Sequence, residues 1–494
     1  MDHEIELKFL IPPEAAALAL AQLQGEGAVR QLDATYFDTP DHLLRKAGFG
    51  LRVRDGEGGR KQTLKSASAG GVFSRGEWEE KIAGPGPDRD ALARTPAAAM
   101  LAGEALAPVF TTRVERTVRM VQVGDALIEA ALDRGELSAD GRRAAVCELE
   151  LELKAGEPGA LFDLARQLSR SVPLRLSLIS KAERGYGLAS GSDAAPPPRR
   201  QAAALEPKAT VGEALQALGQ ATLAHLCAGL EALRERPEPD AVHQARVATR
   251  RLRALLKILK PLTQDVAAQR LDAELDWLAG EFDAARDLDV FVGEVWEKQV
   301  AGATFTGREA FERGLKAAHA NAYLRMEAAL ESVRIRDVLL EAAAWLEAGA
   351  WTRDPALAEI RNGRAATFAA QRLEHHRRQV KKRAKSFADL DAPARHKLRL
   401  KGKTLRYAAE DLAALFPDHP KRAELFIKAS KAVQDILGEL NDRSVRAALV
   451  ATVAHGDETL ARDAARVVLA DDEGVLLESA GKALDDLLDA KPFW

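Results

Sequence analysis

Charged and apolar residues alternate near the start of this chain, and this alternation constrains the local fold most. The segment 4–9 reads Glu-Ile-Glu-Leu-Lys-Phe, so Glu4, Glu6 and Lys8 occupy every second position. Alternate side chains of a β-strand share a face, which predicts a strand with charges on one side and apolar residues on the other. Two carboxylates about 7 Å apart beside a lysine suit a divalent cation that carries a phosphate, although a solvated strand face fits this one segment equally well.

The same alternation returns further along the chain, where Glu148, Glu150 and Glu152 alternate with leucines. Three aligned carboxylates repel one another, which raises their pKa unless cations lie nearby. Cations in strand register occur earlier in the chain, at Arg52, Arg54, Lys65 and Arg116. A sheet with one charged face could be half exposed to water. If the sheet closes into a barrel instead, the charged face becomes the lumen, and the acids and bases form a polar tunnel.

Taken together, these segments resemble a known family. The first part of the chain is similar to the CYTH domain of the triphosphate tunnel metalloenzymes. The matching pieces occur in order over residues 1 to about 190: Glu4-x-Glu6-x-Lys8, Tyr36-Phe37-Asp38-Thr39, Leu51-Arg52-Val53-Arg54, Leu64-Lys65, Leu132-Asp133-Arg134-Gly135-Glu136, Glu148-x-Glu150-x-Glu152 and Ser180-Lys181-x-Glu183-Arg184-Gly185-Tyr186. One short motif of this kind is weak evidence, whereas the ordered set is specific.

The resemblance implies a fold and a set of site residues. The family's fold is an antiparallel eight-stranded β-barrel tunnel that binds a triphosphate with Mg²⁺ or Mn²⁺. Carried over onto this chain, the catalytic residues that hold the phosphate oxygens are Lys8, Arg52, Arg54, Lys65, Arg116 and Lys181. The metal-binding residues are Glu4, Glu6, Asp133, Glu148, Glu150 and Glu152, and the last four could orient the attacking water instead of holding a second metal.

Composition changes between residues 191 and 206. This stretch is rich in Pro and Ala, and three consecutive prolines at 196–198 favour an extended linker. Before it, glycines and β-branched residues punctuate short strands, and after it Ala, Leu, Arg and Glu recur with helical spacing. We therefore expect an α+β multidomain protein with the barrel at 1–190, the linker at 191–206 and an all-α domain at 207–494.

The helical half carries an internal repeat of basic residues. Two sets share the spacing i, i+3, i+7 and i+10: His243, Arg246, Arg250 and Arg253, then His396, Arg399, Lys403 and Arg406. On a helix each set falls within an arc of roughly 80°, and Lys257 extends the first. A single stripe of this kind is more simply a solvated helix face, but two matched copies indicate duplication, with repeats at about 207–345 and 346–494. A polyanion along the stripes would relieve the repulsion between their like charges.

This half resembles the CHAD domain, a histidine-containing α-helical domain found attached to CYTH domains. The resemblance rests on the two stripes and on the segments Arg286-Asp287 and Asn441-Asp442 downstream of them. It implies two four-helix bundles related by a pseudo-twofold axis, with the stripes facing a central channel that binds inorganic polyphosphate. Gly438, shortly before the second segment, predicts a tight turn there that the first copy lacks.

Composition argues against several other classes of protein. Two cysteines, Cys147 and Cys227, do not make a disulfide scaffold, and the charged N-terminus lacks the apolar region of a signal peptide. No stretch approaches the roughly 18 consecutive apolar residues of a membrane span. Aromatic residues make up 5% of the chain, too few for a good base-stacking platform, so we do not expect a nucleic-acid partner. These features predict a cytoplasmic protein.

The sequence therefore predicts a metal-dependent inorganic triphosphatase that hydrolyses tripolyphosphate, with a helical domain that binds long-chain inorganic polyphosphate. Phosphoryl transfer to water needs positioning and charge neutralisation more than a covalent nucleophile, and the charged face supplies both. Two alternatives stay open. The protein could be a polyphosphate-binding module, or one that targets polyphosphate granules, with a weakly active tunnel. It could also act on thiamine triphosphate or cyclise a nucleotide, as relatives with this tunnel do.

Overall fold

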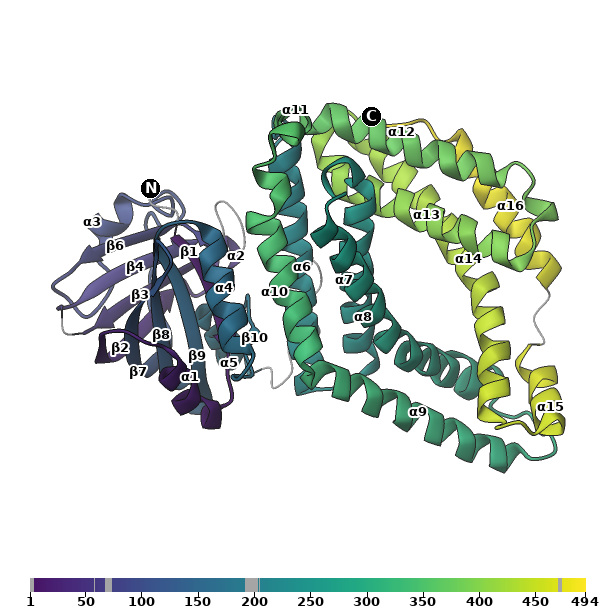
Figure 1. Cartoon of the computed structure of the whole chain (residues 1–494), viewed down its shortest axis with the longest axis horizontal. Helices are drawn as coiled ribbons and strands as arrows, with labels where there is room; N and C mark the ends of the chain where they lie inside the picture. Colours follow the sequence, from purple (N-terminus) through teal and green to yellow (C-terminus); the bar gives the residue numbers. More distant parts are fainter. Residues whose placement is uncertain (1–3, 57, 67–72, 192–202, 204, 470–472) are drawn as a thin grey trace. The chain divides into compact units, whose positions relative to one another are not determined.

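The computed structural model of this chain describes residues 4–56, 58–66, 73–191, 203, 205–469 and 473–494. The chain divides into two compact units, one built on a β-sheet and one helical (Figure 1). The β unit comprises residues 1–198 together with α10 (Val333–Ala348), and the helical unit comprises the rest. The predicted order, a strand-rich part followed by a helical part, is confirmed.

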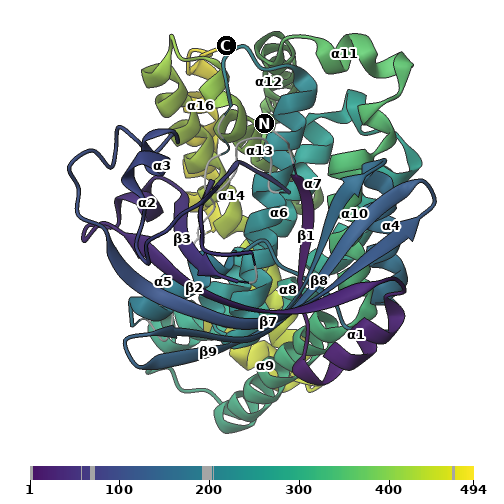
Figure 2. The ribbon, with the colours of Figure 1, turned by 90° about the vertical axis from the view of Figure 1, so that its left-hand side faces the viewer.

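One antiparallel sheet forms the β unit. Its strands are β1 (Glu4–Leu10), β2 (Gly27–Asp38), β3 (Phe49–Asp55), β4 (Lys61–Ser66), β5 (Ser74–Arg75), β6 (Glu77–Lys81), β7 (Ala107–Val123), β8 (Ala126–Ala139), β9 (Arg142–Ala155) and β10 (Arg175–Leu176). Their order is β10-β1-β9-β8-β7-β2-β3-β4-β6. Only Gly76 separates β6, which pairs with β4, from β5, which pairs with β1. The sheet therefore closes on itself (Figure 2). With β5 and β6 taken as one interrupted strand, and the two-residue β10 as a short addition to β1, the predicted eight-stranded barrel is confirmed.

The outer face of the barrel is apolar and is covered by short helices. Leu44 of α2 (Leu43–Lys46) and Leu92 of α3 (Arg89–Ala93) pack with Leu51, Val53 and Leu64 of β3 and β4. Near the start of the chain lies α1 (Ala16–Gln22), and after β9 comes α4 (Pro158–Ser169), which packs against β9. The apolar residues that the alternation assigned to one side of each strand thus form the core outside the barrel.

The last helix of the β unit before the linker, α5 (Lys181–Ala189), begins at a capping box in which Ser180 and Glu183 bond reciprocally. Tyr186 of α5 packs against Tyr36 and Phe110 in an apolar cluster. Gly185 lies so close to Phe110 that an added Cβ would be 2.1 Å from the ring. Only glycine fits this approach, and the approach holds Lys181, at the start of the helix, over the charged face of the sheet.

The helical unit contains two sets of antiparallel helices. The first set is α6 (Val211–Glu235), α7 (Pro239–Ile258), α8 (Val266–Val290), which continues into the π-helical turn η3 (Phe291–Gln299), and α9 (Arg308–Glu331). The second set is α12 (Ala365–Ala384), α13 (Ala392–Leu412), α14 (Pro420–Val453), the shorter α15 (Glu458–Val468) and α16 (Glu473–Asp489), with α11 (Ala358–Asn362) before it. Neighbouring helices within each set pack together, and α7 packs against α13. No helix among the described residues is both long and apolar enough to cross a membrane.

Helix α10 separates the two sets in the sequence but belongs to the β unit, where it packs against α4 and β10. Its side chains Ile335, Leu340 and Leu346 are almost completely buried. Glu341 also lies 3.1 Å from Arg166 of α4. The chain therefore leaves the helical unit after α9, adds one helix to the β unit and returns for the second set.

Candidate functional site

Cross-strand register brings the alternating residues of β1 and β9 onto one face of the sheet. Glu6 lies opposite Glu152, and Lys8 lies opposite Glu150. Glu4 begins β1, but its side chain lies outside the part of the chain that the structure describes. The predicted metal-binding and phosphate-binding residues of these two strands thus share the charged face.

Lys181 lies at the centre of a group of carboxylates on this face. Its ammonium is 2.9 Å from Asp133, 2.6 Å from Glu148 and 2.7 Å from Glu150. Asp133 and Glu148 are 1% and 0% exposed. Charges removed from water to this extent depend on their partners, because an unpaired buried charge costs several kcal/mol.

Arg116 of β7 binds two of the same carboxylates. Its Nε and Nη2 donate to the two oxygens of Asp133 at 2.7 Å each, a bidentate arrangement, and Nη2 also donates to Glu150 at 2.5 Å. Arg184 of α5 donates to Glu148. Three cations and three carboxylates therefore form one network, hereafter the lumen cluster: Arg116, Lys181, Arg184, Asp133, Glu148 and Glu150.

The ion pairs keep the lumen cluster charged despite its burial. Burial opposes ionisation of Glu150, but Lys181 and Arg116 outweigh it and hold the pKa of that carboxyl well below its usual range. Burial likewise opposes the charge on Lys181, but its carboxylate partners raise the pKa of the ammonium well above its usual range. An anion entering the lumen must therefore compete with carboxylates for the same cations.

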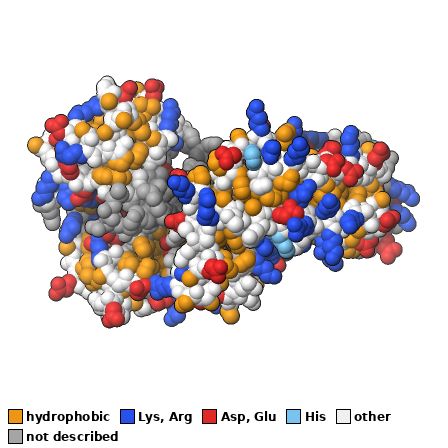
Figure 3. All heavy atoms as spheres, turned by 90° about the horizontal axis from the view of Figure 1, so that it is seen from above, with side chains coloured by type: hydrophobic (Ala, Val, Ile, Leu, Met, Phe, Trp, Pro, Cys, Tyr) orange, Lys and Arg blue, Asp and Glu red, His pale blue; other side chains and the backbone are white. Residues whose placement is uncertain are grey.

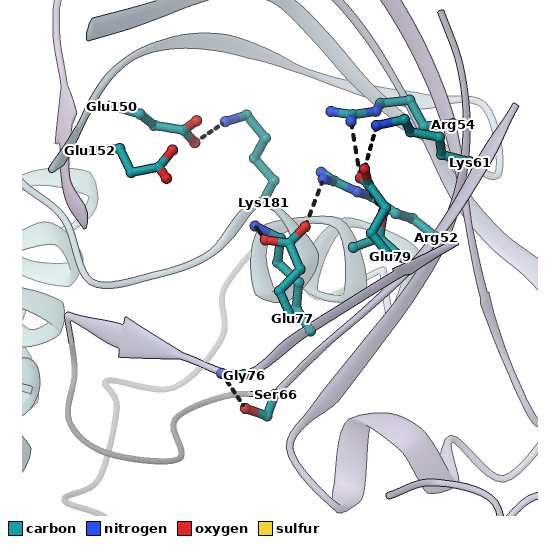
Figure 4. A network of polar contacts seen from close by, with 12 residues as sticks. Arg52, Arg54, Lys61, Ser66, Gly76, Glu77, Glu79, Glu150, Glu152 and Lys181 are labelled. Carbon is teal, nitrogen blue, oxygen red and sulfur yellow. Dashed lines mark hydrogen bonds and ion pairs between the residues drawn. The ribbon is translucent and has the colours of Figure 1, made fainter. Parts of the chain in front are cut away.

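A second set of ion pairs lies on β3, β4 and β6. The pairs are Lys65–Glu77 (2.8 Å), Arg52–Glu77 (4.0 Å), Arg54–Glu79 (3.3 Å) and Lys61–Glu79. Figure 4 shows the side chains of Arg52, Arg54, Lys61, Glu77 and Glu79 directed into the same interior space as Glu150, Glu152 and Lys181. Burial opposes the charge on Glu77, but Lys65 and Arg52 outweigh it and lower the pKa of that carboxyl. Five of the six predicted phosphate-binding cations thus lie on two walls of the lumen, already paired with carboxylates, and Lys8 donates from β1 to the carbonyl of Ile179.

Glu77 and Glu79 are lumen residues that the sequence analysis missed. They alternate around Trp78, the same signal that marked the first strand, and register places them opposite Lys65 and Thr63. Arg184 belongs to the Ser180–Tyr186 motif, but the sequence alone did not predict a role for it in the site. The signal for Glu77 and Glu79 was therefore present, although the partners of these residues could be known only from the closed barrel.

Carboxylate oxygens are the ligands that Mg²⁺ and Mn²⁺ prefer, and the lumen supplies them. Among the described residues, however, no group of three or more Asp, Glu, His or Cys side chains is arranged to hold a metal ion. The three carboxylates of the lumen cluster are bound to its cations. Glu6 has no ion-pair partner in the described part of the chain, and Glu152, which lies opposite it, is bound by Lys154. The donor chemistry therefore fits a divalent cation at Glu6 and Glu152 that displaces Lys154 and leaves Lys181 in place.

The Tyr36–Thr39 motif has a structural role. Asp38 is fully buried and accepts hydrogen bonds from the backbone N–H groups of Leu44 and Arg45 at 2.9 and 3.0 Å. It also accepts one from the Tyr186 hydroxyl at 2.8 Å. This carboxylate fastens α2 and α5 to the barrel, so its contribution to the site is to position Lys181.

In the helical unit, the predicted basic residues form one stripe on α7 (His243, Arg246, Arg250, Arg253 and Lys257) and one on α13 (His396, Arg399, Lys403 and Arg406). The middle of each stripe faces the other. Arg399 and Lys403 lie within electrostatic reach of Arg246 and Arg250. Arg246 is the counterpart of Arg399 in the repeat, and Arg250 of Lys403, so the two copies meet at equivalent positions.

This meeting of like charges shifts the pKa of Lys403. Burial and the neighbouring Arg250 and Arg399 lower the pKa of its ammonium to about 6. Burial, Arg286 and Arg246 also lower the pKa of His243, at the corner of the α7 stripe. Cations of the two stripes therefore lie close enough to disfavour one another's charge, although Asp283, Asp287 and Asp442 act on the same groups in the opposite direction.

Carboxylates neutralise the α7 stripe. Arg250 lies 2.7 Å from Asp283 of α8, which Arg246 also binds. Arg253 lies 3.0 Å from Asp272 and also binds Asp276, one helical turn further along α8. The first stripe is thus held by a row of acids on the neighbouring helix.

The α13 stripe has fewer such partners. Arg406 pairs with Glu410 of its own helix at 3.2 Å, and His396 bonds to the amide of Asn441 at 2.8 Å. Within the described residues, no carboxylate lies within 4 Å of the cationic groups of Arg399 or Lys403. The two copies therefore carry similar cations, but carboxylates neutralise more of the charge on α7 than on α13.

Gly438 does not form the expected tight turn, because α14 runs unbroken from Pro420 to Val453. The segment Arg286-Asp287 likewise lies inside α8. Burial raises the pKa of Asp287, and Asp283 and Asp442 contribute to the shift. Asp287 and its counterpart Asp442 thus lie close together, which is what two copies related by a twofold axis require.

Two family models match this chain. Residues 2–186 match the CYTH domain, and residues 217–451 match the CHAD domain. These matches agree with the two units in order and in secondary structure.

Similar proteins include an inorganic triphosphatase of Haemophilus influenzae, which is 33% identical over 198 residues. That match covers 38% of this chain and 56% of the relative, so the chain spans about half of that protein's length. An uncharacterized protein of Mycobacterium tuberculosis is 26% identical over 488 residues, covering 90% of this chain and 87% of that protein. The structure of the CHAD domain of the plant Ricinus communis matches with a TM-score of 0.50 and 28% identity, over 58% of this chain and 96% of that domain.

Proposed function

For this chain, which carries a CYTH domain at residues 2–186 followed by a CHAD domain at 217–451, we propose the activity of an inorganic triphosphatase. In this proposal the tunnel hydrolyses tripolyphosphate to orthophosphate and diphosphate, and the helical unit binds long-chain inorganic polyphosphate. The observation that carries the first part is the closed lumen with cations on two of its walls. A linear anion with several charges is the ligand that such a lumen suits.

The cations would bind the phosphate oxygens by displacing their present partners. Arg116 can offer a bidentate fork to a phosphate as it now does to Asp133, and Lys181 acts as a point charge. On the other wall, Arg52, Arg54 and Lys65 would do the same, and Lys8 would contribute from β1. Each phosphate group would thus replace a carboxylate that is already ionised.

Divalent-metal dependence is general among triphosphate tunnel enzymes, and the residues here fit it. Mg²⁺ or Mn²⁺ bound by Glu4, Glu6 and Glu152 would neutralise charge on the phosphate oxygens. The carboxylates of Asp133, Glu148 and Glu150, once separated from their cations, would orient a water and accept its proton. The water oxygen forms the new bond to a terminal phosphorus, the anhydride P–O bond breaks, and diphosphate leaves.

The test is phosphate release from tripolyphosphate by the full chain. Glu6→Gln and Arg116→Gln should each lower turnover at least a hundredfold, because each removes charge that the lumen uses in the transition state. Glu115→Gln is a matched control, since this carboxylate neighbours Arg116 on β7 but points to the other face and pairs with Arg134. Wild-type turnover by Glu6→Gln with saturating metal would overturn the metal assignment, and EDTA should silence the wild type.

Binding of polyphosphate by the helical unit rests on the convergence of the two stripes. Four cations from equivalent positions of the repeat face one another, and only part of their charge is neutralised. A polyanion between them would remove this repulsion and release counterions, so the logarithm of its affinity should fall linearly with the logarithm of salt concentration. Titration calorimetry of the full chain in EDTA measures this slope, and a slope near zero would exclude the stripes as an anion site.

One observation favours a second candidate, a polyphosphate-binding protein with a weakly active tunnel that associates with polyphosphate granules. Lys181 holds three carboxylates that could otherwise act in hydrolysis, and displacing it requires breaking buried ion pairs. Turnover of tripolyphosphate that stays near the uncatalysed rate, together with tight binding of long polyphosphate, would select this candidate. Comparison of tripolyphosphate with ATP and thiamine triphosphate separates the nucleotide and thiamine alternatives.

A further inference from the structure

A second group of cations lies on the helical unit beyond the two stripes. Its members come from the end of α7, the 3₁₀ turn η2 (Lys260–Leu262), α12 and α13. They are Lys257, Lys260, Arg372, Arg378, Arg383 and Lys401, hereafter the outer basic cluster. In the view from above, Lys and Arg side chains lie along this unit with Asp, Glu and His side chains among them (Figure 3).

The helices that carry these cations pack together, because α12 and α7 each contact α13, and the cations lie within electrostatic reach of one another. Burial, then Arg383, Lys257 and Lys260, lower the pKa of Lys401. His375 of α12 lies among them, and its pKa is lowered by burial and by Arg372, Lys401 and other cations of the group. Two segments that are distant in the sequence, the end of α7 with η2 and the helices α12 and α13, therefore bring their charges to one place.

Acids that would neutralise the group are scarce. Within the described residues, no carboxylate lies within 4 Å of the cationic groups of Lys257, Lys260, Arg383 or Lys401. Arg378 pairs with Glu374 at 2.7 Å. An ordinary solvated surface mixes charges of both signs, whereas this one concentrates one sign in a protein whose net charge is -3.

The group is also held in place by the fold. The Arg372 guanidinium donates from Nε to the carbonyl of Ile258 at 2.7 Å and from Nη2 to that of Lys257 at 3.4 Å. These are carbonyls at the C-terminus of α7, where the helix dipole is negative and cations are stabilised. Arg372 thus ties α12 to the end of α7 and offsets the partial negative charge that would repel an anion there.

Lys257 connects the outer basic cluster to the α7 stripe. It lies one turn beyond Arg253 on the same face of α7, and Lys401 and Lys260 are its neighbours at the helix end. We propose that the outer basic cluster is a second polyanion subsite, contiguous with the stripes, which lets one long polyphosphate chain bind both. The inference rests on the proposed binding of polyphosphate between the stripes. It adds that the helical unit binds long polyphosphate chains more tightly than short ones.

Polyphosphate fits this subsite better than nucleic acid does. The cluster supplies point charges and guanidinium groups, which bind phosphate oxygens without regard to bases. Two linked subsites also favour the longer of two polyanions, because binding at the first raises the effective concentration at the second.

The test uses the full chain in EDTA, so that the tunnel does not turn over the ligand. Lys260→Gln, Arg383→Gln and Lys401→Gln are combined in one variant, which removes three exposed or half-buried charges without breaking an ion pair. The control combines Lys421→Gln, Lys428→Gln and Lys431→Gln, three exposed lysines of α14. Affinities for long-chain polyphosphate and for tripolyphosphate are measured by titration calorimetry, with circular dichroism to verify folding.

The expected result is at least a tenfold loss of affinity for long-chain polyphosphate in the outer variant. Its affinity for tripolyphosphate should stay within twofold, and the control should match the wild type for both ligands. Equal losses in the outer variant and the control would show a general effect of net charge and overturn the inference. A loss for duplex DNA without a loss for polyphosphate would overturn the identity of the ligand.

A stripe variant, Arg399→Gln with Lys403→Gln, separates this inference from the proposal on which it rests. If the stripe variant loses affinity for long polyphosphate and the outer variant does not, the subsite is absent and the stripes remain the binding site. If neither variant loses affinity, the proposed polyphosphate site itself is wrong.

Discussion

The lumen of the β unit and the facing stripes of the helical unit collect similar cations but treat them differently. In the lumen, Arg116 and Lys181 are bound to carboxylates whose pKa is lowered by the pairing. Between the stripes, Arg399 and Lys403 face other cations, and burial together with those cations lowers the pKa of Lys403. The lumen is internally neutralised, and so is most of the α7 stripe, whereas on the α13 stripe Arg399 and Lys403 have no carboxylate within 4 Å among the described residues.

This difference indicates two ways to prepare a protein for a phosphate chain. A lumen filled with ion pairs is stable by itself and can exchange one partner for another, which suits chemistry on a bound substrate. A surface of repelling cations is destabilised by itself and is relieved by any suitable polyanion, which suits binding. Removal of a cation should therefore lower the folding stability of the β unit when the cation lies in the lumen. Removal of a cation between the stripes should reduce the repulsion between like charges there.

The largest effect is expected for Lys181→Gln in the lumen. The substitution leaves Asp133, Glu148 and Glu150 with fewer cations, and breaking a buried ion pair by removing one partner costs about 3–5 kcal/mol. Urea denaturation of the full chain should show this loss in the transition of the β unit. Arg399→Gln, the matched change between the stripes, should leave stability unchanged or raise it.

The loss in Lys181→Gln should also depend on pH. The pKa of Glu150 is lowered in the folded wild type, so its pairing stabilises the fold above the unfolded pKa of a carboxyl and that stability disappears as pH falls through the folded pKa. Without Lys181 the gain from ionising these carboxylates is smaller, so the deficit of the variant should be larger at pH 7 than at pH 3. A deficit that does not change with pH would mean that Lys181 stabilises the fold by packing alone.

The next effect is on polyphosphate affinity. Neutralising Arg250, Arg253, Lys403 and Arg406 together should lower the affinity for long-chain polyphosphate by well over tenfold, more than about 1.4 kcal/mol. Calorimetry with duplex DNA as a competing polyanion measures both affinity and selectivity. Unchanged affinity in this variant would remove the stripes from the site, and equal affinity for DNA at physiological salt would indicate a generic polyanion surface.

A smaller effect is expected from the titration of Lys403. Because its pKa is about 6, it is largely neutral in the free protein at pH 7.5 and charged at pH 5.5. Polyphosphate should therefore bind more tightly as pH falls through this range, by at most about tenfold per pH unit for one proton. Lys403→Arg should flatten the profile, since arginine stays charged throughout this pH range. Identical profiles for the two proteins would exclude Lys403 as the titrating group.

Local patterns in the sequence predicted much of this structure. Alternation places Glu6, Glu150 and Arg116 on one face of a sheet because the side-chain period of a strand is fixed at two residues. Helical spacing places Arg246 and Arg250 on one face of α7, because residues four positions apart lie about one turn apart on an α-helix. Both patterns depend only on local geometry, and the structure reproduces them.

Partners could not be predicted in the same way. The contact of Lys181 with three carboxylates depends on α5 packing against the barrel through Gly185 and Tyr186. Gly438 suggested a turn because glycine is common in tight turns, but α14 continues through this residue as one helix. Helix α10 has buried residues all along its length, so its pattern gives no sign that it joins the β unit and not the helices before and after it.

Turnover of defined substrates by the full chain tests the central claim most directly. Tripolyphosphate, ATP, thiamine triphosphate and long-chain polyphosphate are each supplied with Mg²⁺, with Mn²⁺ and with EDTA, and the products are quantified by ³¹P NMR. The account predicts the highest kcat/KM for tripolyphosphate, equal amounts of orthophosphate and diphosphate, and no turnover in EDTA. No hydrolysis of tripolyphosphate with either metal, or a clear preference for a nucleoside or thiamine triphosphate, would contradict it.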